Sequence, residues 1–504
     1  MKKFFIIVPV VLITICLVFS LISCSPKADD SADKAINSGL SNMNVSNNDA
    51  GGESYTEIIE NDFVTTATTN TSYFSIDANT ASYPNLRNRI MQNLGIAKDA
   101  VRVEEMLNYF SYDYTKPTDG SIMSLTTSVY DNPYNPETKL MTIGLASKEV
   151  EFTAVKNNLV FLIDVSGSMY SADKLPLVQE AFKLLTENLN AEDRVSIVTY
   201  AGSDKIVLDG AYGNEKKKIT AVIEDLIAGG STAGSEGINT AYNIASKYFI
   251  EGGNNRVILA TDGDFNVGIS NTNALGEFIA EKRTSGIYFS VYGFGTGNIQ
   301  SDKMEELALK GNGIYSYIDS VNEARRALVT DIGGSLVTVA KDVKAGVTFN
   351  TEYVESFRLI GYENKLLTEE EFNNENTDAG ELGSGHTITV VYEIKLTEKE
   401  FVSGENFADV VLKYKSTENS GESNEESSLT LGITTDKYHS AMSAQDAFIA
   451  SVIEFALILR DSNYKANADL NALITRLDNL DLNSDEFKVE FRDLVKKYRE
   501  NVGG

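Results

Sequence analysis

The sequence predicts an α/β fold with a doubly wound, mostly parallel sheet, flanked by antiparallel β modules and a C-terminal helical region. Three observations predict this fold class. Short apolar runs alternate with helix-length amphipathic segments over residues 158–330, which is typical of a parallel sheet covered by helices on both faces. Segments on both sides of that stretch alternate polar and apolar residues as antiparallel strands do. After residue 443, a broad apolar face repeats at helical spacing.

The composition limits the kinds of function. A length of 504 residues suits about three domains of ~150 residues each. Asp and Glu number 72 against 44 Lys and Arg, a net charge of −28, which argues against nucleic-acid binding because acidic surfaces repel phosphate backbones. Both cysteines, Cys16 and Cys24, lie near the amino terminus, so a metal in the body would be held by oxygen ligands. Only two histidines are present, which disfavours most hydrolase chemistry.

The first segment predicts export and lipid anchoring. Residues 1–23 form a signal peptide in our interpretation, because Lys2 and Lys3 precede an apolar run over residues 4–22. The sequence Leu-Ile-Ser-Cys that ends at Cys24 looks like a lipobox, in which cleavage precedes a lipid-modified cysteine. We therefore expect an extracytoplasmic protein that is lipid-anchored to a bacterial membrane or cell surface. The alternative is an uncleaved transmembrane anchor, since the run is about long enough to span a bilayer.

The next two parts of the chain differ in composition. Residues 24–57 are dominated by Ser, Asn, Asp, Ala and Gly and predict a flexible tether. Residues 58–157 predict an N-terminal α+β module. Its expected elements are a strand at Tyr73–Asp77, a helix at Val101–Phe110, and hairpin strands at Ser124–Tyr130 and Lys139–Ala146.

Residues 158–330 predict the α/β domain. Its strands are short apolar runs without polar alternation, as expected for strands buried on both faces. The expected strands are Leu159–Ile163, Val195–Tyr200, Val257–Ala260 and Ile287–Val291, and the expected helices are Lys174–Leu189 and Glu236–Phe249.

The remaining chain predicts a β module over residues 331–432 and a helical region over residues 433–504. The expected strands are Gly346–Phe349, Ser356–Ile360, Thr387–Leu396 and Ala408–Lys415. Ser443 and Asp446 resemble a helix-capping pair. We expect residues 124–146 and 346–415 to form one sandwich into which the α/β domain is inserted.

Carboxylate and hydroxyl side chains gather where the predicted parallel strands end. Asp164, Ser166 and Ser168 follow the first strand, Asp262 follows a later one, and a glycine-rich segment over residues 229–234 leads into a helix. Ligands of such sheets bind at the carboxyl ends of the strands. Spacing at i, i+2 and i+4 places the first three side chains on one side of an extended segment. An all-oxygen set of this kind suits a hard cation such as Mg²⁺.

This order of residues resembles the metal-ion-dependent adhesion site of von Willebrand factor type A (VWA) domains, which have a Rossmann-like fold. The resemblance implies Mg²⁺ or Mn²⁺ held by Ser166, Ser168 and Thr232. It further implies that Asp164 and Asp262 act on the metal directly or through water. The sixth position would take an Asp or Glu carboxylate of a protein partner.

The resemblance is incomplete in the glycine-rich loop. The family's loop often reads Gly-Gly-Thr, whereas Ser231 precedes Thr232 here, so Ser231 stays an alternative ligand. Asp264 lies nearby in sequence and has no assigned role. Flanking segments are similar to modules of bacterial lipid-anchored proteins of this type, so the likeness covers most of the chain after residue 58. These segments are Phe74–Asp77, Ala81–Tyr83, Arg102–Met106, Arg358–Asn364, Asp378–Glu381 and Gly385–Thr387.

Other interpretations of the same residues stay open. Asp164 and Asp262 taken singly could cap helices or accept hydrogen bonds from loop amides. A Mg²⁺-dependent phosphatase would also use a strand-end aspartate, but it would want a second acid where Ser166 stands. Ser171 and Lys174 match the Ser-x-x-Lys pair of some serine hydrolases. Because they lie at the start of a predicted surface helix, we interpret that match as chance.

The sequence therefore predicts a lipid-anchored, extracytoplasmic binding protein that is not an enzyme. It would capture an acidic side chain of a protein partner through a divalent metal. A metal-stabilised scaffold or assembly protein of the cell envelope is the alternative, in which the partner binds the β or helical modules.

Overall fold

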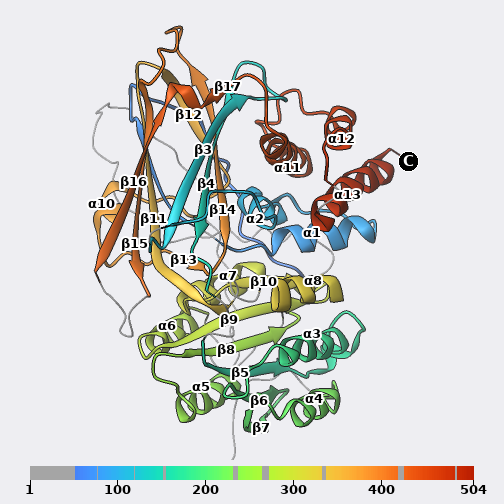
Figure 1. Ribbon diagram of the computed structural model, residues 1–504. Helices are drawn as coiled ribbons and strands as arrows, with labels where there is room; N and C mark the ends of the chain where they lie inside the picture. The colour runs from blue at the N-terminus through green and yellow to red at the C-terminus, as the bar shows by residue number, and fades with distance from the viewer. Residues whose placement is uncertain are drawn as a thin grey trace, which may run out of the picture. The chain divides into compact units, whose positions relative to one another are not determined.

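The computed structural model describes most of the chain after its first 51 residues (Figure 1). It describes residues 52–503 with the exception of 77, 119, 151–154, 231–235, 264–271, 332–335, 418–424 and 483–484. The predicted signal peptide, most of the tether, Cys24, Ser231, Thr232 and Asp264 lie outside the described residues. Among the described residues, no helix has the length and apolar character needed to cross a membrane.

The parallel sheet is confirmed. Its strand order is β10-β9-β8-β5-β6-β7, and every neighbouring pair is parallel except β6 and β7. The strands are β5 (Asn157–Asp164), β6 (Arg194–Tyr200), β7 (Asp204–Tyr212), β8 (Asn254–Thr261), β9 (Ile287–Phe294) and β10 (Tyr315–Ile318). Neither β7 nor β10 was predicted from the sequence. Both are edge strands, and β10 is only four residues long, so neither produces the apolar run of a central strand.

Helices cover both faces of this sheet. Successive side chains of β5 point to opposite faces: Leu159, Phe161 and Ile163 belong to one hydrophobic cluster, Val160 and Leu162 to another. The first cluster includes residues of α3 (Leu175–Glu187), α4 (Lys216–Glu224) and α8 (Val321–Arg325), and the second includes residues of α5 (Gly237–Lys247), α6 (Thr272–Arg283) and α7 (Ser301–Lys310). The fold is therefore the doubly wound arrangement that the sequence predicts.

Two mostly antiparallel sheets form a sandwich, with strands from chain segments that precede and follow the α/β domain; β17 and β3 are a parallel pair. One has the order β1-β12-β14-β4-β3-β17, and the other β13-β11-β15-β16 with β2 also paired to β11. The strands are β1 (Val64–Thr65), β2 (Thr71–Ser75), β3 (Met123–Asp131), β4 (Lys139–Ser147), β11 (Thr338–Phe349), β12 (Val354–Ile360), β13 (Gly380–Gly383), β14 (Thr387–Leu396), β15 (Asn406–Ser416), β16 (Glu426–Thr434) and β17 (Tyr438–His439). Because Met141 pairs with Tyr392 and Phe74 with Ala345, the expected insertion of the α/β domain into a sandwich is confirmed.

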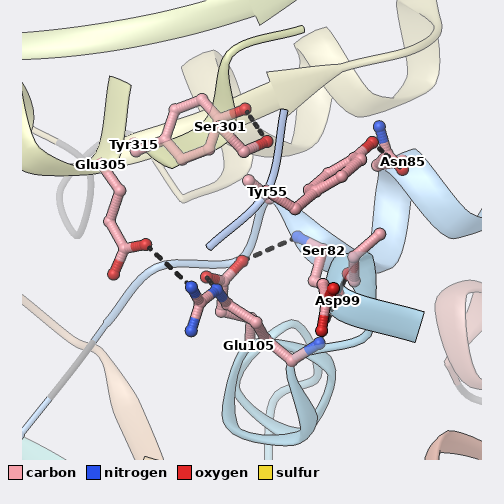
Figure 2. A pocket seen from close by; sticks show the side chains of 11 residues that line it. Tyr55, Ser82, Asn85, Asp99, Glu105, Ser301, Glu305 and Tyr315 are labelled. Atoms are coloured by element: carbon pink, nitrogen blue, oxygen red, sulfur yellow. Dashed lines mark hydrogen bonds and ion pairs between the residues drawn. The ribbon is translucent and has the colours of Figure 1, made fainter. Parts of the chain in front are cut away.

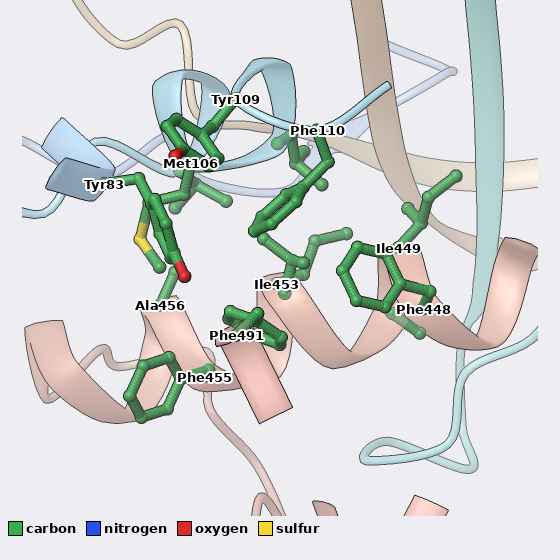
Figure 3. Packing of buried hydrophobic residues seen from close by; sticks show 14 of the residues in the cluster. Tyr83, Met106, Tyr109, Phe110, Phe448, Ile449, Ile453, Phe455, Ala456 and Phe491 are labelled. Atoms are coloured by element: carbon green, nitrogen blue, oxygen red, sulfur yellow. The ribbon is translucent and has the colours of Figure 1, made fainter. Parts of the chain in front are cut away.

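Helices from the two ends of the described chain share one core (Figure 3). The helices of this core are α1 (Ser82–Met91), α2 (Val103–Asn108), α11 (Ala444–Arg460), α12 (Leu470–Asp478) and α13 (Glu486–Val502). The chain also has short helical elements at Lys98–Ala100, Gly167–Tyr170, Arg326–Thr330, Glu369–Asn373 (α10) and Thr435–Lys437. Phe110 lies with its ring centroid 5.0 Å from that of Phe448 and 5.4 Å from that of Phe491. The Ser443 hydroxyl accepts the amide hydrogen of Asp446, as the sequence predicts. Residues 58–157 thus share their cores with later parts of the chain.

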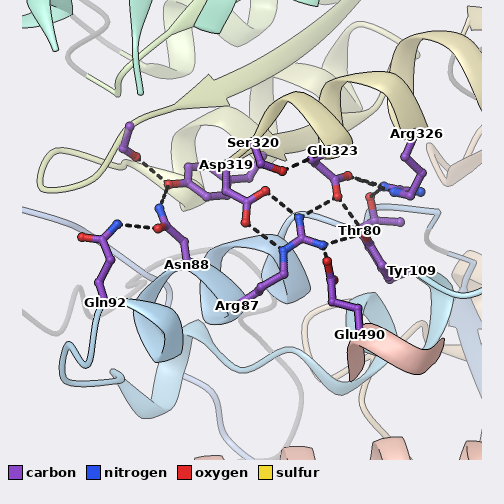
Figure 4. Close-up of polar contacts among 12 residues, drawn as sticks. Thr80, Arg87, Asn88, Gln92, Tyr109, Asp319, Ser320, Glu323, Arg326 and Glu490 are labelled. Atoms are coloured by element: carbon purple, nitrogen blue, oxygen red, sulfur yellow. Dashed lines mark hydrogen bonds and ion pairs between the residues drawn. The ribbon is translucent and has the colours of Figure 1, made fainter. Parts of the chain in front are cut away.

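An ion-pair network joins these helices to the α/β domain (Figure 4). Arg87 of α1 contacts Asp319, Glu323 of α8 and Glu490 of α13, with its Nη1 atom 2.7 Å from Glu490 Oε1 and its Nη2 atom 2.9 Å from Glu323 Oε2. Arg326 also pairs with Glu323, at 2.7 Å. Apart from Glu490, these side chains are less than a tenth exposed. The network therefore fixes three elements to one another through buried charges.

Candidate metal centre

The loop after β5 brings three of the predicted residues together. Asp164 is the last residue of β5 and is completely buried. Its Oδ1 atom accepts the amide hydrogen of Ser166 at 2.8 Å, and the hydroxyl oxygens of Ser166 and Ser168 lie 2.9 Å apart. Gly167 between the two serines is exposed. One buried carboxylate and two hydroxyls therefore converge at the carboxyl edge of the sheet.

Neighbouring strands contact the second oxygen of Asp164. Its Oδ2 atom accepts hydrogen bonds from the Tyr200 hydroxyl at 3.2 Å and from the Thr261 hydroxyl at 3.4 Å. Burial raises the pKa of Asp164 to about 6, the hydrogen bonds from Ser166 oppose this shift, and the negative charge of Asp262 adds to it. The anionic form of Asp164 is therefore poorly stabilised by the residues around it, and a cation at this edge would stabilise it.

Asp262 follows β8 and is also buried, and only one of its two carboxylate oxygens has a partner among the described residues. Its Oδ2 atom lies 2.8 Å from the Lys174 ammonium. Its Oδ1 atom has no hydrogen-bond partner among the residues that the structure describes. A buried carboxylate oxygen without a partner is costly in free energy, and a metal or a metal-bound water could satisfy it.

The glycine-rich segment runs beside the same loop. The Gly229 amide donates to the Val165 carbonyl at 2.8 Å, and the Gly230 carbonyl accepts from Gly167 at 3.2 Å. Gly230 has a φ of +95°, and a Cβ atom there would lie 3.3 Å from the Ala201 carbonyl oxygen, so the position favours glycine. These hydrogen bonds hold Gly229 and Gly230, the residues directly before position 231, against the loop that follows β5. Thr232 itself, a predicted ligand, lies outside the described residues.

The ligand set depends on hydroxyl groups. Within the described ranges, no group of three or more His, Cys, Asp or Glu side chains could hold a metal ion. Asp164 and Asp262 supply two carboxylates, and the serine hydroxyls supply the remaining described oxygens. Oxygen ligands of this kind fit Mg²⁺, which commonly binds through one or two carboxylates and retains waters.

Lys174 was missed as a member of this site. The sequence analysis placed it with Ser171 on a surface helix, and that placement is wrong for Lys174, which is 8% exposed. The Ser171 hydroxyl donates to Asp173 rather than to the lysine. Lys174 directly precedes α3, whose first residue Leu175 is buried, but the contact of Lys174 with Asp262 leaves no signal in the sequence.

A small polar cavity is lined by none of the proposed metal ligands (Figure 2). Its volume is about 20 Å³, which is room for a single water. Arg102 lies 3.8 Å from Glu105 and 3.7 Å from Glu305 in its wall, and Ser82 donates its amide hydrogen to Glu105 at 2.7 Å. Arg102, Glu105 and Glu305 pair with one another, and Asp99 accepts the amide hydrogen of Ile58 at 2.9 Å, so the cavity has the features of a structural site.

Three family models match the chain. They are the von Willebrand factor type A domain over residues 158–330, a von Willebrand factor model over residues 49–142, and the C-terminal model of the uncharacterized protein YfbK over residues 334–500. Uncharacterized protein YfbK of Escherichia coli is 43% identical over 331 residues, which cover 64% of this chain and 58% of that protein. The match thus spans a little over half of that relative's length.

Other proteins are similar to parts of the chain at lower sequence identity. Human inter-alpha-trypsin inhibitor heavy chain H3 is 25% identical over 269 residues, covering 49% of this chain and 29% of its own. A solved von Willebrand factor type A protein from Catenulispora acidiphila has a TM-score of 0.42 at 17% identity, covering 77% of this chain and 91% of that one. An aerotolerance-related membrane protein from Bacteroides fragilis has a TM-score of 0.29 at 22% identity, covering 35% and 98%.

Proposed function

We propose that this chain, a YfbK-like protein with a von Willebrand factor type A domain, binds a divalent metal and through it captures an acidic side chain of a protein partner. Mg²⁺ or Mn²⁺ would be held by the hydroxyls of Ser166 and Ser168, with Asp164 and Asp262 as the carboxylates, and Thr232 is the further ligand predicted from the sequence. When bound, the metal supplies a coordination position for a carboxylate oxygen of the partner.

The buried charge balance at the sheet edge is the observation that carries the proposal. Asp164 and Asp262 are at most 1% exposed, and the cation paired with them among the described residues is Lys174. Two carboxylates and one ammonium leave one uncompensated negative charge in a buried place, which is unfavourable without a further cation. Two hydroxyls 2.9 Å apart beside this charge supply the oxygen ligands that a hard cation prefers.

An exposed aromatic residue follows the proposed serine ligands in sequence and supports the proposal of a protein partner. Tyr170 ends the short helical element that contains Ser168, and its side chain is 83% exposed. Exposed aromatic residues are enriched in protein interfaces because they supply a large contact area with few rotatable bonds. We expect a partner whose carboxylate binds the metal to contact Tyr170 as well.

The proposal includes an extracytoplasmic location with Cys24 as the lipidated residue. The net charge of −28 discourages contact between the folded body and anionic headgroups, so the acyl chains would hold the protein at the membrane. Mass spectrometry of the mature amino terminus tests this point. A diacylglyceryl cysteine at position 24 is the expected result, and an intact apolar segment would contradict it.

Metal binding is tested by calorimetry with Mg²⁺ and Mn²⁺ on the full chain in detergent. Asp164→Asn should abolish binding. The matched control is Asp193→Asn: Asp193 is a fully buried aspartate that accepts backbone amides of Asn157 and Asn190 before β6, at the opposite edge of the sheet. Binding that survives Asp164→Asn would contradict the proposed site.

Partner capture is tested with a peptide. A Glu-rich peptide should be retained by the immobilised protein in Mn²⁺ but not in EDTA, and its Gln counterpart should not be retained. If metal binds at this edge but neither peptide is retained, the metal has a structural role and the scaffold alternative is favoured.

A further inference from the structure

Lys174 places a positive charge inside the candidate metal centre. Its ammonium lies 2.8 Å from Asp262 Oδ2, and the exposed fractions of the two side chains are 10% and 0%. The lysine stem packs against Gly295, where a Cβ atom would lie 2.5 Å from the Cγ and Cε atoms of Lys174. Gly295 has a φ of +73°, which favours glycine. The absence of a side chain at position 295 thus makes room for the lysine.

The backbone also fixes this lysine. Its amide donates to the Ser171 carbonyl at 3.0 Å, and its carbonyl accepts from Val178 in the first turn of α3 at 2.9 Å. The ammonium is therefore directed into the site by a helix start and by the packing of its stem. It differs in this from a surface lysine, whose charged end remains in water.

The Lys174 ammonium pairs with only one of the two carboxylates of the site. Asp262 has the ammonium on one oxygen and no partner on the other, whereas Asp164 forms no ion pair within the described part of the chain. A divalent ion that used Asp262 would share its carboxylate with a like-charged ammonium. Like charges in a poorly solvated place repel strongly, so metal and ammonium compete for the same acid.

We propose that Lys174 is a tethered counter-ion that lowers the metal affinity of this centre by competing for Asp262. The inference rests on the proposed function, because it concerns the same metal. Without metal, Lys174 neutralises Asp262 and keeps its carboxylate in place. When metal binds, Asp164 and the two serine hydroxyls hold it most strongly, and Asp262 contributes less than it would in the absence of the lysine.

The test is a Mn²⁺ titration of the full chain, followed by calorimetry and by the electron paramagnetic resonance signal of free Mn²⁺. Lys174→Gln and Lys174→Met should each lower the dissociation constant at least tenfold, a change of about 1.4 kcal/mol. The matched control is Lys183→Gln, which changes the net charge equally. Lys183 lies in the same helix α3 and pairs with Glu180 at 2.7 Å, so its replacement should leave the affinity unchanged.

The outcomes distinguish failure of the counter-ion role from failure of the proposed metal function. Equal affinities in all lysine variants, with binding lost in Asp164→Asn, would overturn the counter-ion role and leave the metal function standing. Weaker binding in the Lys174 variants would also overturn it. Binding that appears only after Lys174 is replaced would support the counter-ion role and would contradict the proposed metal function of the wild-type chain. If no variant binds Mn²⁺, the metal function and the inference fail together.

Circular dichroism and thermal melting establish that the variants fold. Both Lys174 variants should melt below the wild type in EDTA, because Asp262 loses its buried partner. Both should gain more in melting temperature from Mn²⁺ than the wild type gains. A lysine with only a structural role would lower the melting temperature equally with and without metal, and that result would overturn the proposal. The Met variant keeps an apolar stem of similar length if the Gln variant does not fold.

Discussion

Two clusters of buried charge in this molecule differ in the groups that contact a central carboxylate, which is Glu323 in one cluster and Asp164 in the other. In the network around Arg87, Glu323 contacts both Arg87 and Arg326 (Figure 4). Burial alone would raise the pKa of Glu323, but the two arginines outweigh it and lower the pKa below its usual value. At the edge of the parallel sheet, Asp164 is buried to the same extent, and its pKa is raised to about 6.

The difference teaches what a buried carboxylate does in each place. Cations within hydrogen-bond distance keep Glu323 ionised, and the result is a contact that fixes helices to the α/β domain. Asp164 instead has hydroxyls and an amide as hydrogen-bond partners. These groups bind a carboxylate without neutralising it, so the edge of the sheet keeps a capacity for an added cation. The first cluster is structural, and the second is suited to a ligand.

The largest expected effect comes from breaking the structural cluster. Arg87→Met leaves Asp319 buried without its cation, since Asp319 is only 7% exposed, and removing one partner of a buried pair costs about 3–5 kcal/mol. Urea unfolding should show this loss of stability. Lys98→Met is the control, because Lys98 pairs with Asp461 at the surface and exposed pairs contribute little. Equal losses in both variants would contradict the distinction between the clusters.

Metal should stabilise the second cluster and leave the first unaffected. If one metal binds only the folded state, a concentration of about 100 times its Kd adds ~2.7 kcal/mol to the free energy of unfolding. Urea unfolding in Mn²⁺ and in EDTA should show this difference for the wild type and for Lys98→Met. Asp164→Asn should show none of it. A metal effect that persists in Asp164→Asn would place the binding elsewhere.

Glu104 of α2 sharpens the comparison, because it is buried near a cation without contacting it closely. Arg102 lies 3.9 Å from its Oε1 atom, and neither carboxylate oxygen has a hydrogen-bond partner among the described residues. Burial raises the pKa of Glu104 to about 7, Glu363 adds to the shift, and Arg102 opposes it. A raised carboxylate pKa is therefore not confined to the candidate metal centre.

The sign of the pH dependence follows from this shift. Because the folded pKa of Glu104 lies above its ordinary value of 4.5, its contribution to stability is full below about pH 4.5 and is lost as the pH rises through 7. Between pH 5 and 8, the wild type should lose on the order of 2 kcal/mol relative to Glu104→Gln. Urea unfolding across this range measures the difference, and parallel pH profiles for the two proteins would contradict it.

Much of the fold was predictable because burial leaves a local pattern. β5 and β8 are buried on both faces and produce apolar runs, and β14 alternates as a strand of a sandwich does. The shared core of α1, α2, α11, α12 and α13 was not predictable. Each helix shows only its own apolar face in the sequence, and nothing local indicates that Phe110 meets Phe448 and Phe491.

The residues of the candidate metal centre also divide into those that the sequence predicts and those that it does not. Asp164, Ser166 and Ser168 were predictable because one loop sets their spacing, and the structure places them together. Asp262 was expected at the same edge from its strand-end position, and its Coulomb interaction with Asp164 agrees with this. Lys174 was not predictable, because its contact with Asp262 depends on how α3 packs on the sheet.

The smallest expected effect on stability is that of replacing Tyr170, and this substitution tests partner binding without disturbing the fold. Its side chain is 83% exposed, so Tyr170→Ala should change the free energy of unfolding by less than about 0.5 kcal/mol. It should also leave the Mn²⁺ affinity unchanged, because the tyrosine is not among the proposed ligands. Retention of the Glu-rich peptide should nevertheless fall, since an exposed aromatic residue two positions after Ser168 offers contact area to a partner. The second variant of this test is Ile227→Ala. Ile227 is 81% exposed and precedes the glycine-rich segment, so its replacement should also lower retention of the peptide. If both variants retain the peptide as the wild type does, the partner's carboxylate binds the metal without support from this rim.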